Sequence, residues 1–211
     1  MSRARTLANG SYIADNVITL DQMAHLGTDG HVLTSTGTGS APAYEAVSAG
    51  ATLKAITYRL ITTQTNDQNP LGSSTSDWEI ADDMEYEGNM GTPVTQANGI
   101  FTFAETGHYL ILLNIYCIVT GGGADWIAGG IDASDNGSGG SYQQIAAGSS
   151  GSFNADGHAS FSATALADVT NISGSASVCK IAVTKSAATA TWQHSTDTNK
   201  CAITFIKLGD T

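Results

Sequence analysis

The chain of 211 residues has few charged side chains and very few basic ones. Charged residues make up 13% of the sequence, about half the share that is usual in globular proteins. Only 8 residues are Lys or Arg, against 19 Asp and Glu, so the formal net charge is −11. Binding to a phosphate backbone or an anionic bilayer needs clustered basic residues, and here they are scattered. The composition argues against nucleic acid and against an anionic membrane surface as partners.

Long apolar runs and helical patterns are also scarce. No apolar run reaches the ~18 residues of a membrane-spanning helix, and the first residues lack the apolar core of a signal peptide. We therefore expect neither membrane insertion nor classical secretion. Apart from a weak trace at 18–26, no 3.6-residue periodicity persists beyond two turns. Because 41% of the residues are hydrophobic and 24 are glycine, we predict an all-β protein of short strands and many turns.

The three cysteines do not form a disulfide framework. Cys117, Cys179 and Cys201 are an odd number, and each lies inside an apolar segment. Buried free thiols are the preferred interpretation, and a bridge between two of them stays open.

No catalytic or metal-binding constellation stands out. The five histidines show no i, i+4 pairing and no Cys-x-x-Cys companion, and a nucleophile elbow is absent. Cys117 lies in the middle of an apolar strand, which is the wrong setting for a reactive thiolate. Acidic residues are plentiful, but no pair is marked out for glycoside hydrolysis. We expect no enzyme, no resident metal and no cofactor.

One acidic stretch, Asp77–Glu87, offers the oxygen ligands that Ca²⁺ prefers. It lacks the glycine-punctuated loop of a calcium hand, and Trp78 and Ile80 alternate with its charges. A strand edge with solvated carboxylates is therefore favoured over a calcium site.

The chain divides by composition into two parts. Residues 1–50 hold little apolar mass and are dominated by the Gly/Ser/Thr-rich stretch 27–42, which cannot bury enough surface to fold alone. Residues 51–211 show regular strand patterns between turn clusters, with a polar acidic excursion from 64 to about 90. We predict an extended N-terminal segment and a head of eight to ten antiparallel strands. The expected strands are 54–63, 99–103, 108–120, 126–133, 142–147, 159–167, 176–184, 189–194 and 201–208.

The segment His108–Thr120 is apolar on both faces if it forms a strand. Side chains alternate between the two faces of a strand, so the odd-numbered residues from Tyr109 to Val119 form one set. The even-numbered set is also apolar, interrupted only by Asn114. A strand with one face in water would alternate apolar and polar residues. Without helices to cover the second face, the simplest cover is another copy of the chain.

Two stretches of the head carry a family resemblance. Gly99-Ile100-Phe101-Thr102-Phe103, followed by Gly107, Tyr109 and Leu110, resembles a signature of the tumour-necrosis-factor and complement-globular-head superfamily of jelly rolls. The segment Cys201–Asp210 is similar to the last strand of that family. The resemblance covers about 54–211, and the middle strands match only in the spacing of strands and turns. Asn171–Gly174 departs from the family pattern, where a Gly-Asp turn is common.

The resemblance implies a homotrimer, a two-sheet antiparallel jelly roll whose inner sheets pack around a threefold axis. It agrees with the missing cover over the even-numbered set of 108–120, and Asn114 suggests that this set lines the axis. The expected interface residues are Tyr58, Leu60, Leu110, Leu112, Asn114, Tyr116 and Ile118.

The N-terminal part has a resemblance of its own. Gly27–Tyr44 is similar to a glycine-punctuated element of bacteriophage tail-fibre and related virion proteins, and Ala14–Ala24 looks like fibre repeat material. Within it, Val32-Leu33-Thr34 offers one short strand per chain, and the flanking glycines allow copies to approach closely. The resemblance implies that residues 1–50 dock to another virion protein or form a short stalk.

Host recognition is expected in the loops of the head. Exposed aromatic rings beside Asn, Asp and Gln are a common means of holding sugars, and loops carry binding on rigid scaffolds. The alternative is that Trp126, Tyr142 and Trp192 are all core or trimer contacts. The candidate binding residues are Trp126, Asp132, Asp135, Asn136, Tyr142, Asn154 and Asp156.

Together these observations predict a non-enzymatic virion protein, assembled in the host cytoplasm. Its trimeric head would be a fibre or spike that recognises a glycan or protein on the host surface. The alternative is a capsid decoration or head-fibre protein that stabilises or ornaments the particle without a specific receptor. A soluble lectin or secreted signalling trimer is disfavoured by the fibre-like N-terminus and the lack of a signal peptide.

Overall fold

The computed structural model describes residues 31–34, 43–46, 53–82, 88–120, 125–135, 141–153, 157–172, 177–186 and 189–211. The chain divides into two units, Met1–Gly50 and Ala51–Thr211. In the first unit, β1 (His31–Thr34) pairs antiparallel with β2 (Ala43–Ala46). The short strand expected at Val32–Thr34 is present, and its partner is a segment of the same chain.

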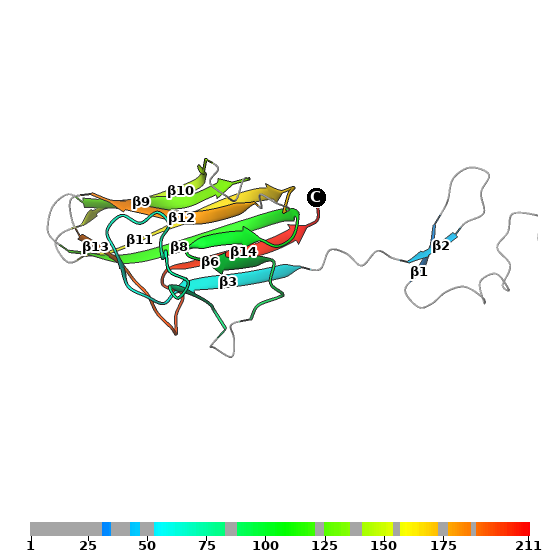
Figure 1. Cartoon of the computed structure of the whole chain (residues 1–211), viewed down its shortest axis with the longest axis horizontal. Coiled ribbons are helices and arrows are strands. Elements are labelled where there is room, and N and C mark those ends of the chain that lie inside the picture. The colour runs from blue at the N-terminus through cyan, green and yellow to red at the C-terminus, as the bar shows by residue number, and fades with distance from the viewer. Residues whose placement is uncertain are drawn as a thin grey trace, which may run out of the picture. The chain divides into compact units, whose positions relative to one another are not determined.

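The second unit, called the head below, consists of two antiparallel sheets (Figure 1). The β9 sheet has the order β10-β9-β12-β7-β6. Its strands are β6 (Val94–Ala97), β7 (Ile100–Phe103), β9 (Asp125–Ser134), β10 (Gln143–Phe153) and β12 (Val178–Lys185).

The second sheet, called the β8 sheet, is built around the long strand β8. One edge of β8 pairs with β11, and the other pairs with β14 and then β13. Its strands are β3 (Lys54–Leu60), β4 (Gln64–Thr65), β5 (Trp78–Ile80), β8 (Gly107–Thr120), β11 (Gly157–Val169), β13 (Thr189–Trp192) and β14 (Ala202–Gly209). All nine strands expected from the sequence are present, with ends shifted by up to six residues. The described part of the head has twelve strands, more than the eight to ten expected.

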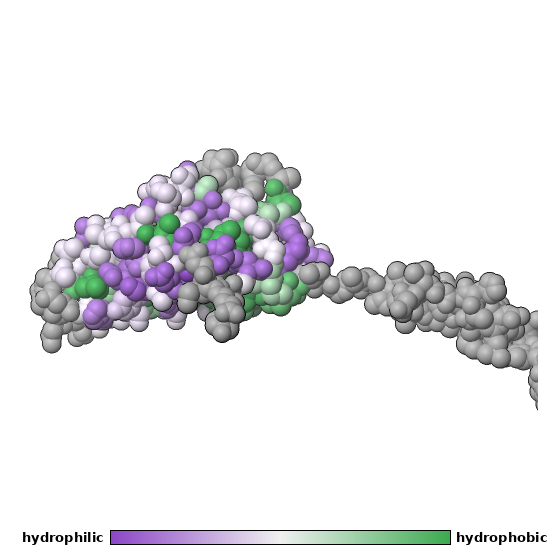
Figure 2. Space-filling model, turned by 90° about the horizontal axis from the view of Figure 1, so that it is seen from below, coloured by the Kyte–Doolittle hydropathy of each residue, from purple (hydrophilic) through white to green (hydrophobic). Residues whose placement is uncertain are grey.

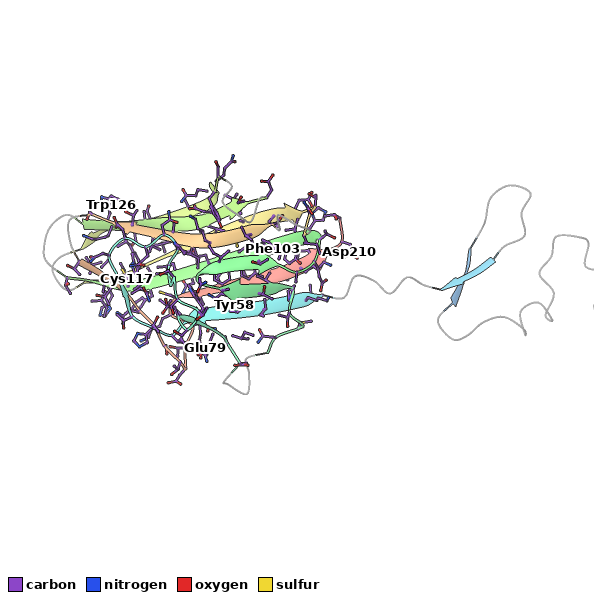
Figure 3. The ribbon with its side chains drawn as sticks, in the orientation of Figure 1. Tyr58, Glu79, Phe103, Cys117, Trp126 and Asp210 are labelled. Atoms are coloured by element: carbon purple, nitrogen blue, oxygen red, sulfur yellow. The ribbon has the colours of Figure 1, made fainter. Side chains whose placement is uncertain are left out.

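The core lies between the two sheets and is formed by alternate residues of each strand. On β8 the odd-numbered residues from Tyr109 to Val119 are buried, and the even-numbered ones face outward. Phe101 lies at the centre, with its ring centroid 5.5 Å from those of Tyr58, Trp78 and Phe205. In Figure 3 the labelled Tyr58, Phe103 and Cys117 lie among the strands of the head.

The two glycines of the signature segment are required by the backbone. Gly99 has φ 74°, and a Cβ there would lie 2.6 Å from the carbonyl oxygen of Gly72. Gly107 has φ 145°, and a Cβ would lie 2.4 Å from the carbonyl oxygen of Gly209. Residues with a side chain are strained in these conformations and would clash with the neighbouring chain. These glycines fix how the turns around β7 and β8 pack on the rest of the head.

An ion pair joins the edge strand β5 to β3. Arg59 is fully buried on the side of β3 that faces away from the core, and its Nε donates to Glu79 Oε1 at 2.7 Å. Asp77, just before β5, accepts hydrogen bonds from Thr62 Oγ1 at 2.5 Å and from the Ser74 amide at 2.8 Å. These two carboxylates of the acidic stretch hold the edge strand β5 and its preceding turn in place. Residues 83–87 of that stretch lie outside the described residues.

We expect Glu79→Gln to lower the free energy of unfolding by about 1–3 kcal/mol, because the buried guanidinium of Arg59 loses the negative charge of Glu79. Urea unfolding monitored by circular dichroism measures the change. Asp197→Asn, in an exposed loop, is the control and should stay within about 0.5 kcal/mol of the wild type. Equal stability of Glu79→Gln and the wild type would show that the pair contributes nothing.

Candidate functional site

The outward face of the β8 sheet is the first candidate surface. The register aligns Leu166, Leu110 and Ile206 in one row across β11, β8 and β14. The next row contains Thr164, Leu112 and Thr204. Further residues on this face are Thr57, Asn114, Tyr116, Ile118, His158, Ser160, Ser162 and Leu208.

Apolar side chains on this face are exposed to water in the single chain. Leu166 is 74% exposed, Leu208 51% and Leu112 38%. A hollow of about 460 Å³ opens beside the first row, lined by His108, Leu166, Ala167, Asp168, Leu208 and Gly209. Figure 2 shows a different view of the head, where apolar residues lie in separate small patches among hydrophilic ones. Aligned exposed leucines on adjacent strands are a mark of a protein contact surface.

Several polar groups on this face have partners within the chain. Asn114 Nδ2 donates to the Lys200 carbonyl at 3.1 Å, and the Thr57 and Thr204 hydroxyls are 2.9 Å apart. The Tyr116 hydroxyl lies 2.6 Å from His158 Nδ1, and the two rings stack with centroids 5.7 Å apart. Covering these groups with a second surface would therefore leave few unpaired donors or acceptors.

Two of the expected interface residues lie elsewhere. Tyr58 and Leu60 of β3 point into the core, and the Tyr58 hydroxyl donates to the Val94 carbonyl at 2.9 Å. Their inclusion in the interface is wrong, because the alternation along β3 turns both residues away from the outward face. Leu110, Leu112, Asn114, Tyr116 and Ile118 do lie on that face, as the position of Asn114 suggested.

The outward face of the β9 sheet is the second candidate surface, and it brings together part of the expected binding set. Trp126 of β9 is 45% exposed, and its backbone exchanges hydrogen bonds of 3.0 Å with Ser186. Asp132 lies six residues further along the same face of β9 and pairs in register with Lys180 of β12. The Lys180 ammonium lies 4.0 Å from the centroid of the Tyr142 ring. These residues therefore occupy a sheet face and its end, not a cluster of loop tips.

A groove of about 590 Å³ lies on this face, between Trp126 and Asp132 along β9. Its floor and rim come from β9, β10 and β12, and one wall comes from the segment after β4. That segment is held against β12 because Gln68 and Val183 exchange backbone hydrogen bonds of 2.9 Å. The lining residues are Asp67, Gln68, Asn69, Ala128, Gly129, Gln144, Ala147, Gly148, Ser149, Ala182, Val183 and Thr184.

No pattern in the sequence indicated the wall. Asp67, Gln68 and Asn69 belong to an acidic, polar stretch and lie more than a hundred residues from Thr184 in the chain. The Asp67 carboxylate Oδ1 accepts hydrogen bonds from the Lys185 amide at 3.0 Å and from Thr184 Oγ1 at 3.2 Å. The groove forms only because this segment packs against the part of β12 that does not pair with β7.

Among the other expected binding residues, Asp135 does not line the groove. Asp135 is exposed just past the end of β9, and Asn136, Asn154 and Asp156 lie outside the described residues. Trp192 is fully buried, and its Nε1 donates to the Asn66 carbonyl at 2.6 Å. The core interpretation therefore holds for Trp192 and not for Trp126.

The cysteines are buried and free, as the sequence indicated. Burial raises the pKa of Cys117 to about 12 and that of Cys201 to about 11. Cys201 Sγ also donates to the Tyr116 carbonyl at 3.1 Å. Thiols in this state stay protonated near neutral pH and are poor nucleophiles. Among the described residues, no three His, Cys, Asp or Glu side chains gather where they could hold a metal ion.

Comparison with solved structures places the head in a known architecture. Eiger TNF from S. frugiperda superposes with a TM-score of 0.55 at 16% identity, over 75% of this chain and 94% of that chain. The head is a TNF-like jelly roll. Murine APRIL, in structures at pH 5.0 and pH 8.5, gives a TM-score of 0.52 at 10% identity, over 74% of this chain and 99% of that chain. At such identities the likeness establishes the fold alone.

The sequence itself matches no protein-family model and no curated protein. Across the part of the chain that the structure describes, no helix has the length and apolar character to span a membrane. The expected all-β jelly roll is confirmed, and the ligand has to be argued from the surfaces of this chain.

An ion cluster joins the start and the end of the jelly roll. Glu105 binds the ammonium groups of Lys54 on β3 and Lys207 on β14, the second at 3.1 Å. Lys207 Nζ also lies 2.6 Å from Asp210 Oδ1. Figure 3 shows Asp210 and Trp126 at opposite ends of the head. The first and last strands of the head are thus fastened together at the end away from Trp126.

This cluster predicts a loss of stability in acid. Hydrogen bonds from Lys54 and Lys207 lower the pKa of Glu105, and a hydrogen bond from Lys207 lowers the pKa of Asp210. A carboxylate with a lowered pKa in the folded state stabilises fully above its unfolded pKa of about 4, and its contribution disappears as the pH falls through the folded value. The pKa of Lys207 is raised, so its charge stays constant over this range.

We expect Glu105→Gln to melt below the wild type near pH 7, and the difference to shrink as the pH falls through the lowered pKa of Glu105. Differential scanning calorimetry from pH 7 to pH 3 measures both melting temperatures. A difference that stays constant across this range would show that the Glu105 charge is not responsible.

Proposed function

We propose that the chain is a non-enzymatic, homotrimeric binding protein of a virion, whose jelly-roll head recognises a host surface. The row Leu166–Leu110–Ile206 on the outward face of the β8 sheet carries this proposal, with Leu166 exposed and Leu110 and Ile206 half-buried. Apolar side chains of this face are exposed in the single chain, and several polar groups beside them already have partners inside the chain. Three copies packed through this face would remove the leucines from water.

The proposed assembly leaves the other sheet free. The outward face of the β9 sheet lies on the opposite side of the sandwich, so packing through the β8 sheet does not cover the groove between Trp126 and Asp132. A trimer would thus display three copies of the same site. Multiple weak sites on one particle give the avidity that attachment to a cell surface needs.

The residues at the two ends of the head are compatible with a protein displayed on a particle. Lys54 near the start and Asp210 near the end belong to one ion cluster, and Trp126 lies at the other end (Figure 3). A docking segment that precedes Lys54 would join the head at the cluster end. The resemblance of Gly27–Tyr44 to fibre elements supports residues 1–50 as that docking segment and the virion as its location.

Competition for adsorption tests this function. The purified full chain, added in increasing amounts, should reduce adsorption of the virion that carries it to host cells. Boiled protein and a jelly roll of unrelated sequence serve as controls. Unchanged adsorption at saturating concentration would contradict host recognition and favour decoration of the capsid.

A further inference from the structure

We propose that the groove on the outward face of the β9 sheet binds a neutral glycan chain, with Trp126 as its stacking platform. The inference rests on the proposed function and names the ligand class and the site that the head would use. It also moves recognition from the loop tips, where the sequence placed it, to the face of a sheet.

The floor of the groove suits the flat face of a sugar ring. Ala128, Ala147 and Ala182 lie beside Ser149 and Thr184 on three adjacent strands, so no long side chain rises from the floor. The volume of about 590 Å³ is within the range of small-ligand sites. Along β9, Trp126 and Asp132 are six residues apart, about 20 Å, which accommodates an extended oligosaccharide.

Trp126 supplies an aromatic surface beside one end of the groove, just outside the lining residues. It lies on the same face of β9 as Ala128, two residues away, and 45% of it is exposed. Both hydrogen bonds to Ser186 hold its backbone, so the base of the indole side chain has a fixed position. An aromatic ring with an anchored base is a preorganised platform for the C–H face of a sugar.

The wall and the β10 rim supply the hydrogen-bonding groups that sugar hydroxyls need. Asp67, Gln68 and Gln144 present a carboxylate and two side-chain amides along the groove. Both recorded hydrogen bonds to Asp67 end on Oδ1, so within the described residues Oδ2 keeps its capacity to accept hydrogen bonds from a ligand. Adjacent sugar hydroxyls pair well with such planar groups.

The charge of the site selects a neutral ligand. Asp67 lines the groove and Asp132 lies at its end, while the Lys180 ammonium lies against the Tyr142 ring. The chain as a whole carries a formal charge of −11. The carboxylates of the site would repel sialylated or phosphorylated glycans. None of the described residues that line the groove is a Lys or Arg that could offset this repulsion.

Tryptophan fluorescence gives a direct readout of the site. The chain has three tryptophans, and Trp78 and Trp192 are buried with their indole N–H groups bonded to Leu71 and Asn66 carbonyls. Trp126 should therefore dominate quenching by acrylamide. A neutral oligosaccharide bound in the groove should shield it and reduce that quenching.

The test uses the full chain on an array of neutral and sialylated oligosaccharides, followed by titration with the best neutral binder. We expect binding to neutral chains, protection of Trp126 from acrylamide, and at least a tenfold loss of affinity in Trp126→Ala and in Asp67→Ala. Ile145→Ala is the matched control, because Ile145 is an exposed apolar residue of β10 that lines a different hollow, beside Leu166 and Val169. Its affinity should equal that of the wild type.

The outcomes separate this inference from the proposed function. Binding only to sialylated chains, binding to no glycan, or equal affinity of Trp126→Ala and the wild type would each overturn the glycan groove. If the wild-type chain still blocks virion adsorption in that case, host recognition stands and uses another surface. If the wild-type chain fails to block adsorption, the proposed function itself is contradicted.

Discussion

Replacing Leu110 and Leu166 together with aspartate should convert the assembled protein into monomers. Both leucines lie in the same row of the outward β8 face, and Leu166 is 74% exposed in the single chain. Each buried leucine contributes about 1.5–3 kcal/mol to association, and each introduced carboxylate would be buried without a partner. Sedimentation velocity should show the wild type as an oligomer and the double variant at the 21.6 kDa of one chain.

The control for this experiment is Ile172→Asp. Ile172 is 40% exposed and lies just after β11, outside the rows of the β8 sheet. Its replacement adds the same charge to the surface and should leave the oligomer intact. Circular dichroism should show that all variants keep their strands. An oligomer that survives the double substitution would mean that a different surface holds the copies together.

Truncating Phe101 is expected to have the largest effect on the fold. Its fully buried ring contacts the rings of Tyr58, Trp78 and Phe205, which come from three different strands of the β8 sheet. Phe101→Ala removes the contact between the two sheets at this point and leaves a cavity that the rigid strands cannot close. We expect the free energy of unfolding to fall by about 3–5 kcal/mol.

Urea unfolding of the two variants Phe101→Ala and Trp126→Ala gives the comparison. Both substitutions remove an aromatic ring, but Trp126 is 45% exposed and its ring does not belong to the core. Trp126→Ala should therefore change stability by less than about 1 kcal/mol. A similarly small loss in Phe101→Ala would contradict the central place of this ring in the core.

The strands of the head could be predicted because their patterns are long and regular. In β11, Ala159 to Ala165 alternate without interruption with exposed polar residues, and β8 spans fourteen residues. The short strands β4 and β6 escaped prediction. Val94–Ala97 has one buried residue in four, so alternation has too few repeats to be recognised.

The assembly surface could be predicted on β8 but not on β3. On β8, one polar residue, Asn114, marks the outward set. On β3, Thr57 and Arg59 lie on one side and the apolar Tyr58 and Leu60 on the other. Alternation separates the two sets without showing which of them meets the core of its own chain and which a partner. The groove escaped prediction for another reason. Its wall and floor meet only because Gln68 pairs with Val183, a contact that neither local pattern encodes.

The molar mass of the wild-type chain in solution tests the central claim most directly. Light scattering coupled to size-exclusion chromatography, at micromolar concentration and neutral pH, measures it without any probe or variant. The account predicts three chains of 21.6 kDa, a mass of about 65 kDa. A single species at 21.6 kDa would leave the exposed leucines of the β8 sheet without a cover and would contradict the trimeric head.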